Sequence, residues 1–162
     1  ETYLLSLARC ANEYAGFNLL LGEAGELWYF SNSTADHAPR KLDPGLYGLS
    51  NARLDTPWPK VTLGKKMFQT LLSEKSAPAP ETLFSMLADR SIPDDKELPD
   101  TGVGIEWERT LSPIFITSPA YGTRSSTLLF IDQQDRVTFI EKTFNASPDH
   151  ATTVKYVFRI EN

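Results

Sequence analysis

The alternation of apolar and polar side chains near the carboxyl end constrains the fold of this chain more than any other feature. Ser125–Asp132 and Val137–Lys142 each read as a β-strand, and Gln133–Arg136 between them favours a tight turn. The apolar residues that fall on one face of a further strand are Val154, Tyr156, Phe158 and Ile160. The sequence therefore predicts an antiparallel, strand-rich region at this end of the chain.

The amino-terminal part shows a helical period first and strands afterwards. Residues 2–14 place apolar side chains on one face of a helix, which Gly16 can end. Phe17–Leu21 and Leu27–Ser31, separated by a short turn, predict a hairpin. Leu46–Ser50 predicts a further short strand that ends at Asn51.

Helices are expected in the middle of the chain. Asp55 or Thr56 is a candidate N-cap for a helix with an apolar stripe from Val61 to Leu72. A second short helix is expected around Leu83–Leu87, and residues 91–112 read as a long ordered loop. Because helices and strands are segregated along the sequence, we expect an α+β fold, with residues 1–162 belonging to a single domain.

Composition excludes several functional classes. The chain has 162 residues and a net charge of −5, and its Lys and Arg residues do not cluster, so we expect no nucleic-acid partner. The apolar runs are strand-sized, which predicts no membrane span. Cys10 is the single cysteine, which favours a reduced, cytoplasmic setting. His37 and His150 lie far apart without further ligands, so neither a metal site nor a cofactor is predicted.

Two turns carry the candidate functional residues. Asn51 follows a predicted strand, where its amide can donate to an oxyanion or simply cap the turn. Arg124 lies among the hydroxyls of Tyr121–Thr127, where it can bind a carboxylate or phosphate, or be an ordinary surface arginine. Cys10 falls on the apolar stripe of its helix, as a core residue would.

Several segments, in order along nearly the whole chain, resemble the NRDE family, which includes the transport and Golgi organisation protein two homologues. The matching segments are Tyr14–Gly22, Leu27–Asn32, Gly45–Asn51, Leu54–Val61, Leu98–Gly104, Glu106–Glu108, Ser112–Ile116, Tyr121–Thr127 and Glu141–Phe144. The resemblance implies part of a four-layer αββα sandwich of the N-terminal-nucleophile hydrolase type. It also implies that residues 1–162 are the carboxyl-terminal part of the family domain. The cysteine that follows the initiator methionine and the Asn-Arg-Asp-Glu motif would then lie upstream.

The resemblance also assigns roles to individual residues. It implies that Asn51 lines an oxyanion site and that Arg124 lies near the nucleophile, as in enzymes of the bile-salt hydrolase type. Tyr47, Trp58 and Tyr121 then become candidates for lining a substrate pocket, although each is equally compatible with core packing.

Two functions follow from this resemblance. The first is an amide or acyl hydrolase, inactive in this chain alone because the nucleophile lies outside it. The alternative is a non-catalytic intracellular binding or trafficking protein for haem, acyl-CoA or lipid. The expected partners are a small-molecule ligand or substrate, together with the upstream segment or another copy of the chain, because sheet edges and apolar surface would otherwise stay uncovered.

Overall fold

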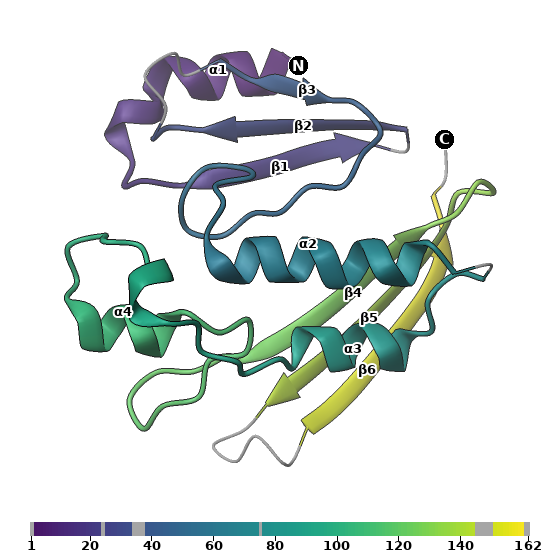
Figure 1. Ribbon diagram of the computed structural model, residues 1–162. Helices are drawn as coiled ribbons and strands as arrows, with labels where there is room; N and C mark the ends of the chain where they lie inside the picture. The colour runs from purple at the N-terminus through teal and green to yellow at the C-terminus, as the bar shows by residue number, and fades with distance from the viewer. Residues whose placement is uncertain (1, 24, 34–37, 75, 145–150, 161–162) are drawn as a thin grey trace. The chain divides into compact units, whose positions relative to one another are not determined.

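The chain forms a mixed α+β structure with two three-stranded antiparallel sheets. The computed structural model describes residues 2–23, 25–33, 38–74, 76–144 and 151–160 (Figure 1). These divide into two compact units, an amino-terminal unit of residues 1–57 and a carboxyl-terminal unit of residues 58–162. Each unit has its own sheet and its own buried core.

The amino-terminal unit is a helix on one face of a small sheet. Its elements are α1 (Thr2–Cys10), a 3-10 turn η1 (Ala11–Glu13), β1 (Asn18–Glu23), β2 (Glu26–Ser31) and β3 (Arg40–Leu42). The strands follow the order β1-β2-β3 and are antiparallel. Leu4, Ala11 and Phe30 are fully buried between the helix and the sheet, and Leu19 and Trp28 pack against them. Apolar burial by α1 therefore stabilises one face of this sheet.

Asn32 ties the end of β2 to the segment that follows α1. Its Oδ1 accepts a hydrogen bond from the backbone N–H of Phe17 at 2.7 Å. Its Nδ2 donates to the backbone oxygens of Ala11 at 3.0 Å, Ala15 at 3.0 Å and Tyr14 at 3.3 Å. One side chain thus bonds to four backbone groups in the segment from Ala11 to Phe17.

The carboxyl-terminal unit also places helices on one face of a sheet (Figure 1). Its elements are α2 (Pro59–Leu72), α3 (Pro80–Leu87), a 3-10 turn η2 (Asp95–Glu97), α4 (Ile105–Leu111), β4 (Ser125–Ile131), β5 (Arg136–Phe144) and β6 (Ala151–Arg159). Both α2 and α3 begin with proline, whose fixed φ suits the first helical turn. The strand order is β4-β5-β6, antiparallel throughout.

The two faces of this second sheet differ. On one face, Leu128 and Ile140 are buried against Leu83 and Phe84 of α3, with Phe68 of α2 packed beside them. The opposite face carries exposed apolar side chains. They are Leu129, Ile131, Val154, Tyr156 and Phe158. Every residue of β6 is exposed, so this strand is held mainly by its ladder with β5.

Much of the predicted order of elements is confirmed. The amino-terminal helix, the first hairpin, the two central helices and the hairpin of β4 and β5 all occur near their predicted places. In β6, Val154, Tyr156 and Phe158 share one face as predicted, and Tyr156 pairs with Phe139 and Phe158 with Val137. Ile160 was predicted on the same face but lies beyond the end of β6. That residues 1–162 form a single domain stays a prediction.

Three local predictions are wrong. Leu46–Ser50 is not a strand, because Gly48 bonds forward to Asp55 instead of pairing with a neighbouring strand. The N-cap of α2 is Trp58 without a side-chain bond, and the hydroxyl of Thr56 donates to the carbonyl of Arg53 instead. Residues 91–112 contain α4 and a 3-10 turn rather than only loop.

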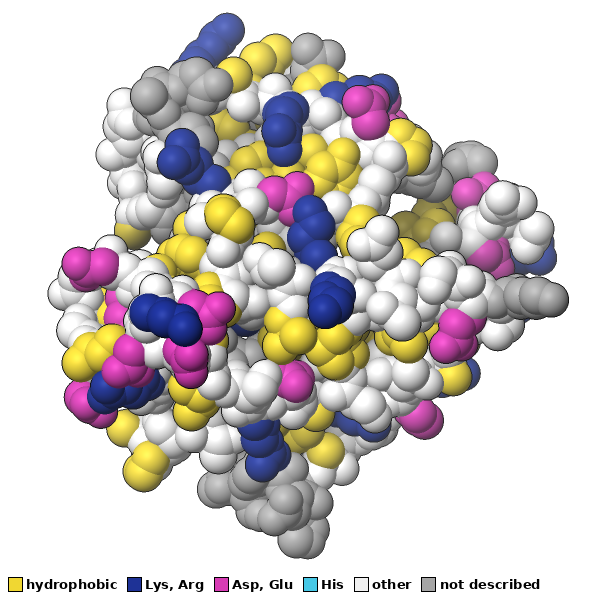
Figure 2. Space-filling model, in the orientation of Figure 1, with side chains coloured by type: hydrophobic (Ala, Val, Ile, Leu, Met, Phe, Trp, Pro, Cys, Tyr) yellow, Lys and Arg dark blue, Asp and Glu magenta, His cyan; other side chains and the backbone are white. Residues whose placement is uncertain are grey.

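Positively charged side chains are scattered over the face in view, and the described helices are short. On the face shown in Figure 2, Lys and Arg side chains are scattered among acidic and apolar ones rather than gathered into one patch. Within the described part of the chain, no helix has the length and apolar character that crossing a membrane requires. The absence of a nucleic-acid partner stays a prediction.

Candidate functional site

Asn51 lies in a turn that closes on itself. The backbone N–H of Gly48 donates to Asp55 Oδ1 at 2.8 Å, and the N–H of Asp55 donates back to the carbonyl of Gly48 at 2.7 Å. Asp55 adopts a left-handed conformation with φ of 59°, which an aspartate tolerates better than most side chains. These bonds fix both ends of the segment that contains Asn51.

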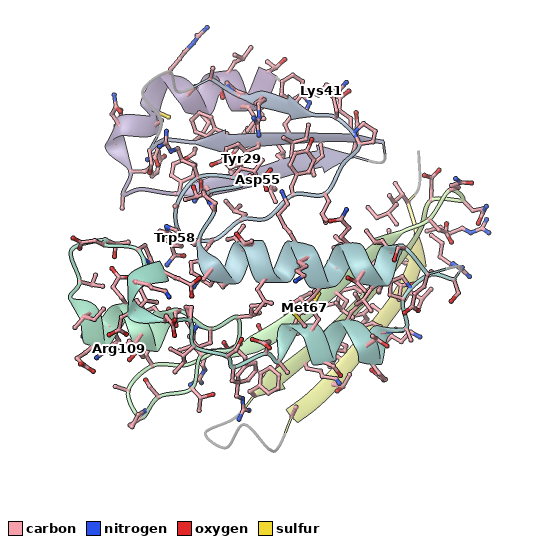
Figure 3. All side chains as sticks on the ribbon, viewed as in Figure 1. Tyr29, Lys41, Asp55, Trp58, Met67 and Arg109 are labelled. Atoms are coloured by element: carbon pink, nitrogen blue, oxygen red, sulfur yellow. The ribbon has the colours of Figure 1, made fainter. Side chains whose placement is uncertain are left out.

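Two side chains of the β1-β2-β3 sheet also bond to this turn. Asn18 Nδ2 donates to the carbonyl of Ala52 at 2.8 Å, and the backbone N–H of Leu54 donates to Tyr29 Oη at 3.1 Å. The Tyr29 hydroxyl donates in turn to Asn18 Oδ1 at 2.6 Å. Tyr29 is only 7% exposed, so these bonds are shielded from competing water. Figure 3 shows Tyr29 and Asp55 near each other in this unit.

The Asn51 side chain itself takes no part in this bonding. Asn51 is exposed, and its amide makes no hydrogen bond with any residue that the structure describes. A turn-capping asparagine would donate to, or accept from, a nearby backbone group. The locked turn therefore presents an amide whose donors are available to a ligand.

The Tyr47 side chain and the Trp58 backbone bond within their own segments, and neither ring lines a described cavity. The Tyr47 hydroxyl donates to the carbonyl of Asp43 at 2.9 Å, and its ring lies against Gly45, where a Cβ would approach the ring to 3.3 Å. Trp58 opens α2, and its carbonyl accepts the N–H of Thr62 at 3.0 Å. Neither ring lines either of the two cavities described next.

The amino-terminal unit contains a cavity of about 420 Å³, here called the arginine cavity. Its lining includes Tyr29, Arg40, Arg53, Leu54, Asp55 and Thr56. Sequence reasoning missed both arginines. Arg53 lies just beyond Asn51, a signal that was available in the sequence, whereas Arg40 belongs to β3, which no periodicity indicated.

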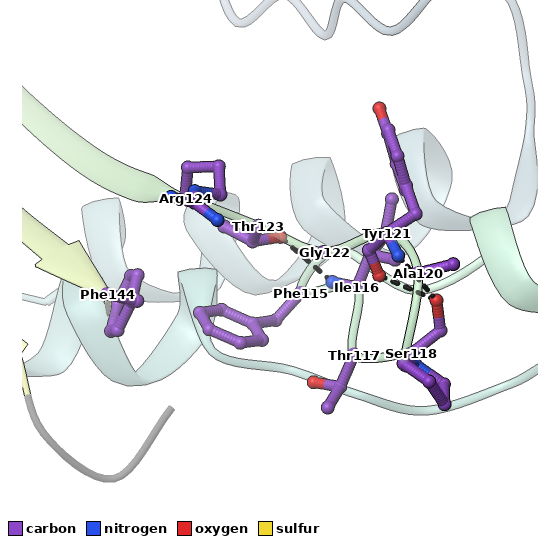
Figure 4. Close-up of a pocket in the computed structure, with 11 residues that line it drawn as sticks. Phe115, Ile116, Thr117, Ser118, Ala120, Tyr121, Gly122, Thr123, Arg124 and Phe144 are labelled. Atoms are coloured by element: carbon purple, nitrogen blue, oxygen red, sulfur yellow. Dashed lines mark hydrogen bonds between the residues drawn. The ribbon is translucent and has the colours of Figure 1, made fainter. Parts of the chain in front are cut away.

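The carboxyl-terminal unit contains a second cavity of about 240 Å³, here called the turn cavity (Figure 4). It is lined by the continuous segment Phe115–Arg124 and by Phe144. The turn closes through Thr123, whose N–H donates to the carbonyl of Ile116 and whose Oγ1 accepts the N–H of Ile116, both at 2.9 Å. The rings of Phe115 and Phe144 meet edge to face at 4.8 Å.

Arg124 and Tyr121 both line the turn cavity. Tyr121 is 52% exposed, and the carbonyl of Arg124 accepts the N–H of Phe144 at 2.8 Å. Among the described residues, the Arg124 guanidinium has no ion-pair partner. The structure thus brings Tyr121 and Arg124 together in one unit, and Tyr47 and Asn51 together in one loop of the other.

A half-buried lysine of α2, Lys60, bonds to α4 close to the buried Glu108. Lys60 Nζ donates to the carbonyl of Leu111 at 2.7 Å. Burial lowers the pKa of this ammonium, and the nearby charge of Glu108 opposes that shift. Glu108 is buried and accepts hydrogen bonds from the N–H and hydroxyl of Thr101 at 2.7 and 2.6 Å. Sequence reasoning missed this pair because it placed Glu108 in a loop.

The described residues show no metal cluster, and Cys10 bonds within its own helix. Within them, no group of three or more His, Cys, Asp or Glu side chains could hold a metal ion. Cys10 is half-buried on α1 and directs its thiol at the carbonyl of Leu7 at 3.5 Å. His37 and His150, expected to be isolated loop residues, lie outside the described residues.

Comparison with known proteins identifies the family. Residues 1–146 match the family model described as Transport and Golgi organisation 2. The Transport and Golgi organization protein 2 homologs of Bos taurus and Homo sapiens are 31% and 28% identical over 99% of this chain. The Transport and Golgi organization protein 2 of Drosophila melanogaster is 28% identical over 64% of this chain and 38% of its own length.

The chain spans 63% of the length of the bovine and human relatives. The match covers both units, including the Asn51 turn and the Arg124 turn. The family resemblance expected from the sequence motifs is confirmed, and the chain belongs to the Transport and Golgi organisation 2 (NRDE) family.

Proposed function

We propose that this chain supplies the oxyanion-donating and substrate-positioning residues of a protein that hydrolyses amide or acyl bonds. In this proposal Asn51 donates its amide N–H to the tetrahedral oxyanion. Arg124 steadies the substrate or the nucleophile through its guanidinium. The nucleophile is an amino-terminal cysteine of the full-length protein, with its own α-amino group as the base.

The observation that carries the proposal is the contrast between Asn51 and its turn. Hydrogen bonds with the side chains of Asn18, Tyr29 and Asp55 hold the backbone around it, while its own amide is left without a bonded partner among the described residues. A donor that stabilises developing negative charge works best when its position is set before the reaction begins. An asparagine with a purely structural role would instead bond to the backbone of its own turn.

Arg124 supports the proposal through its charge. Its backbone is anchored to Phe144, and its guanidinium borders the turn cavity without an ion pair among the described side chains. Guanidinium groups bind carboxylates and oxyanions through paired N–H donors. Tyr121, on the same cavity, provides an exposed aromatic surface for the substrate.

The two units support the finer fold proposal, a four-layer αββα sandwich. In each unit, helices cover one face of a three-stranded sheet. The second face of the β4-β5-β6 sheet carries exposed apolar side chains, which a sheet layer would bury. A cytoplasmic setting remains part of the proposal, based on the single cysteine.

A non-catalytic binding function is the second candidate, favoured by the arginine cavity. This cavity combines arginines with apolar lining, and it needs no nucleophile to bind a ligand. The names of the relatives refer to transport and Golgi organisation rather than to an enzymatic activity. The ligand would be haem, acyl-CoA or another lipid, handled by an intracellular carrier.

The hydrolase proposal is tested on the full-length protein with an activity-based probe that acylates cysteine. We expect the probe to label the amino-terminal cysteine and Asn51→Ala to slow acylation about 10²- to 10³-fold. Gln133→Ala is the matched control, because it removes an exposed turn amide elsewhere. If the cysteine stays unlabelled and Asn51→Ala acts no differently from Gln133→Ala, the hydrolase proposal is wrong.

The binding alternative is tested by incubating the same protein with haem or with acyl-CoA. Saturable thermal stabilisation without turnover would favour it, because a ligand that binds only the folded state raises the unfolding temperature. Release of free coenzyme A, measured with a thiol reagent, would favour the hydrolase instead. Loss of that release in Asn51→Ala would assign it to this site.

A further inference from the structure

We propose that the arginine cavity of the amino-terminal unit binds the anionic group, a carboxylate or a phosphate, of a small organic molecule. Arg40 and Arg53 hold the anion in this proposal. The site goes beyond the proposed hydrolysis, because it requires no nucleophile and serves a catalytic and a non-catalytic protein alike.

The two arginines reach the cavity from separate segments. Arg40 lies on β3 directly opposite Tyr29 of β2, and its guanidinium carbon is 6.0 Å from the centroid of the Tyr29 ring. Arg53 follows the Asn51 turn. Both of its neighbours are anchored, the carbonyl of Ala52 by Asn18 and the N–H of Leu54 by Tyr29. The backbone that carries Arg53 is therefore fixed before any ligand arrives, which lowers the entropic cost of binding.

Arg40 and Arg53 form no ion pair with a carboxylate within the described ranges of the chain. Adjacent Lys41 differs, since its Nζ pairs with Glu26 Oε2 at 2.6 Å. Arg109 and Arg136 in the other unit also pair with carboxylates. Two arginines without a carboxylate partner among the described residues therefore line the same cavity.

The lining carries a positive balance of charge. Asp55 is the carboxylate in the described lining, opposed by two guanidinium groups, and its Oδ1 accepts the N–H of Gly48. Planar guanidinium groups match the oxygen geometry of carboxylates and phosphates. The charge and geometry together select an anion over a neutral or cationic ligand.

The rest of the lining fits an organic molecule rather than a bare ion. Leu54, Pro57 and the ring of Tyr29 contribute apolar surface. The hydroxyl of Thr56 donates to the carbonyl of Arg53 at 2.8 Å and keeps its lone pairs for a ligand donor. A volume of about 420 Å³ lies within the range typical of small-molecule sites, roughly 300 to 1,000 Å³.

The test uses the full-length protein and four probes, namely hexyl phosphate, hexanoate, hexanamide and inorganic phosphate. Calorimetry or ligand-observed NMR gives each dissociation constant at low salt, where charge pairing is least screened. We expect hexyl phosphate and hexanoate to bind more tightly than uncharged hexanamide. We also expect hexyl phosphate to bind more tightly than inorganic phosphate, because only the former fills the apolar lining.

Substitutions of the two arginines test whether hexyl phosphate binds in the arginine cavity. Arg40→Gln and Arg53→Gln should each weaken hexyl phosphate binding about tenfold or more. Arg9→Gln, an exposed arginine of α1 outside the cavity, should leave the affinity unchanged. Arg53→Lys keeps the charge and serves if a glutamine variant fails to fold, and it should weaken binding less than Arg53→Gln.

Three outcomes would overturn the proposal. The first is equal affinity of the Arg40→Gln/Arg53→Gln protein and the parent for hexyl phosphate. The second is hexanamide binding as tightly as hexanoate. The third is inorganic phosphate binding as tightly as hexyl phosphate, which would mean that the apolar lining takes no part.

Discussion

The two cavities of this protein are built in opposite ways. Apart from Phe144, the turn cavity is lined by one continuous segment, Phe115–Arg124, which closes through bonds between residues close in sequence. The arginine cavity is assembled from β2, β3 and the Asn51 turn, and it depends on bonds between residues distant in sequence, such as Asn18 with Ala52. A locally built site survives small disturbances of its surroundings, whereas a site assembled from several segments depends on the whole unit being folded.

The largest expected difference between the two units comes from removing a buried ring from one core at a time. Phe30→Ala should destabilise the amino-terminal unit by about 3–5 kcal/mol, because Phe30 is 0% exposed and its loss leaves a void. Phe84→Ala, at 6% exposure, is the counterpart in the other unit. Hydrogen exchange should show faster opening of β1 and β2 in the first variant and of β4 and β5 in the second. Identical exchange changes in both variants would contradict separate packing of the two cores.

The next largest difference in stability is expected from removing one tyrosine hydroxyl at each cavity. Tyr29→Phe leaves the N–H of Leu54 and the Oδ1 of Asn18 without the bonds that hold the Asn51 turn. We expect a loss of about 1–3 kcal/mol in the free energy of unfolding. Tyr121→Phe removes an exposed hydroxyl and should change it by less than about 0.5 kcal/mol. Urea denaturation of both variants measures the difference in the free energy of unfolding. Equal losses would show that the two hydroxyls contribute alike.

A smaller effect is expected within the turn cavity. Thr123→Val keeps the shape of the side chain but leaves the N–H of Ile116 without its Oγ1 acceptor. The cost should be about 1 kcal/mol, because the segment is half-buried and water can partly replace the bond. Thr123→Ser, which keeps the hydroxyl, should recover most of the stability in thermal unfolding. A serine variant no better than the valine variant would show that the bond contributes nothing.

The smallest effect is expected at the turn after β4, which is also closed by bonds between residues close in sequence. The backbone N–H groups of Arg136 and Gln134 lower the pKa of Asp132 at the end of β4. A carboxyl whose pKa is lower in the folded state stabilises that state above its ordinary value of 3.8, and the benefit is lost as pH falls through the folded value. Asp132→Asn should flatten the acid limb of the stability profile slightly. An NMR titration that finds an unshifted Asp132 pKa would refute this.

The difference between segments closed by near neighbours and segments held by distant residues also explains which parts of the structure the sequence predicts. The β4-β5 hairpin and the Arg124 turn are local, and alternation with turn residues is enough to identify them. Arg40 was missed because β3 is a polar strand of three residues, stabilised by its pairing with β2 rather than by its own pattern. Arg53 was missed because its role depends on anchors in β1 and β2.

Two errors have the same physical origin. Leu46–Ser50 has the composition of a strand, yet Asp55 captures the backbone of Gly48 and turns the chain. α4 is a seven-residue helix whose apolar face is too short to give a periodic signal, and buried Glu108 with its Thr101 partner fixes it instead. In both places a side-chain bond decides the backbone conformation. Asn51, by contrast, was identified as a candidate from its position, and the structure adds that its turn is held by other residues.

The bonding of Asn32 has a consequence for how this protein ages and is modified. Asn32-Ser33 begins a glycosylation sequon and is also a sequence prone to deamidation, in which the Ser33 nitrogen attacks the asparagine side chain. In the folded chain, the Asn32 amide nitrogen is committed to three carbonyls and the Ser33 N–H donates to Ser31 Oγ. Deamidation therefore requires this segment to open first. An isoaspartate at this position would record such an opening, which makes Asn32 a chemical marker of how often the amino-terminal unit opens.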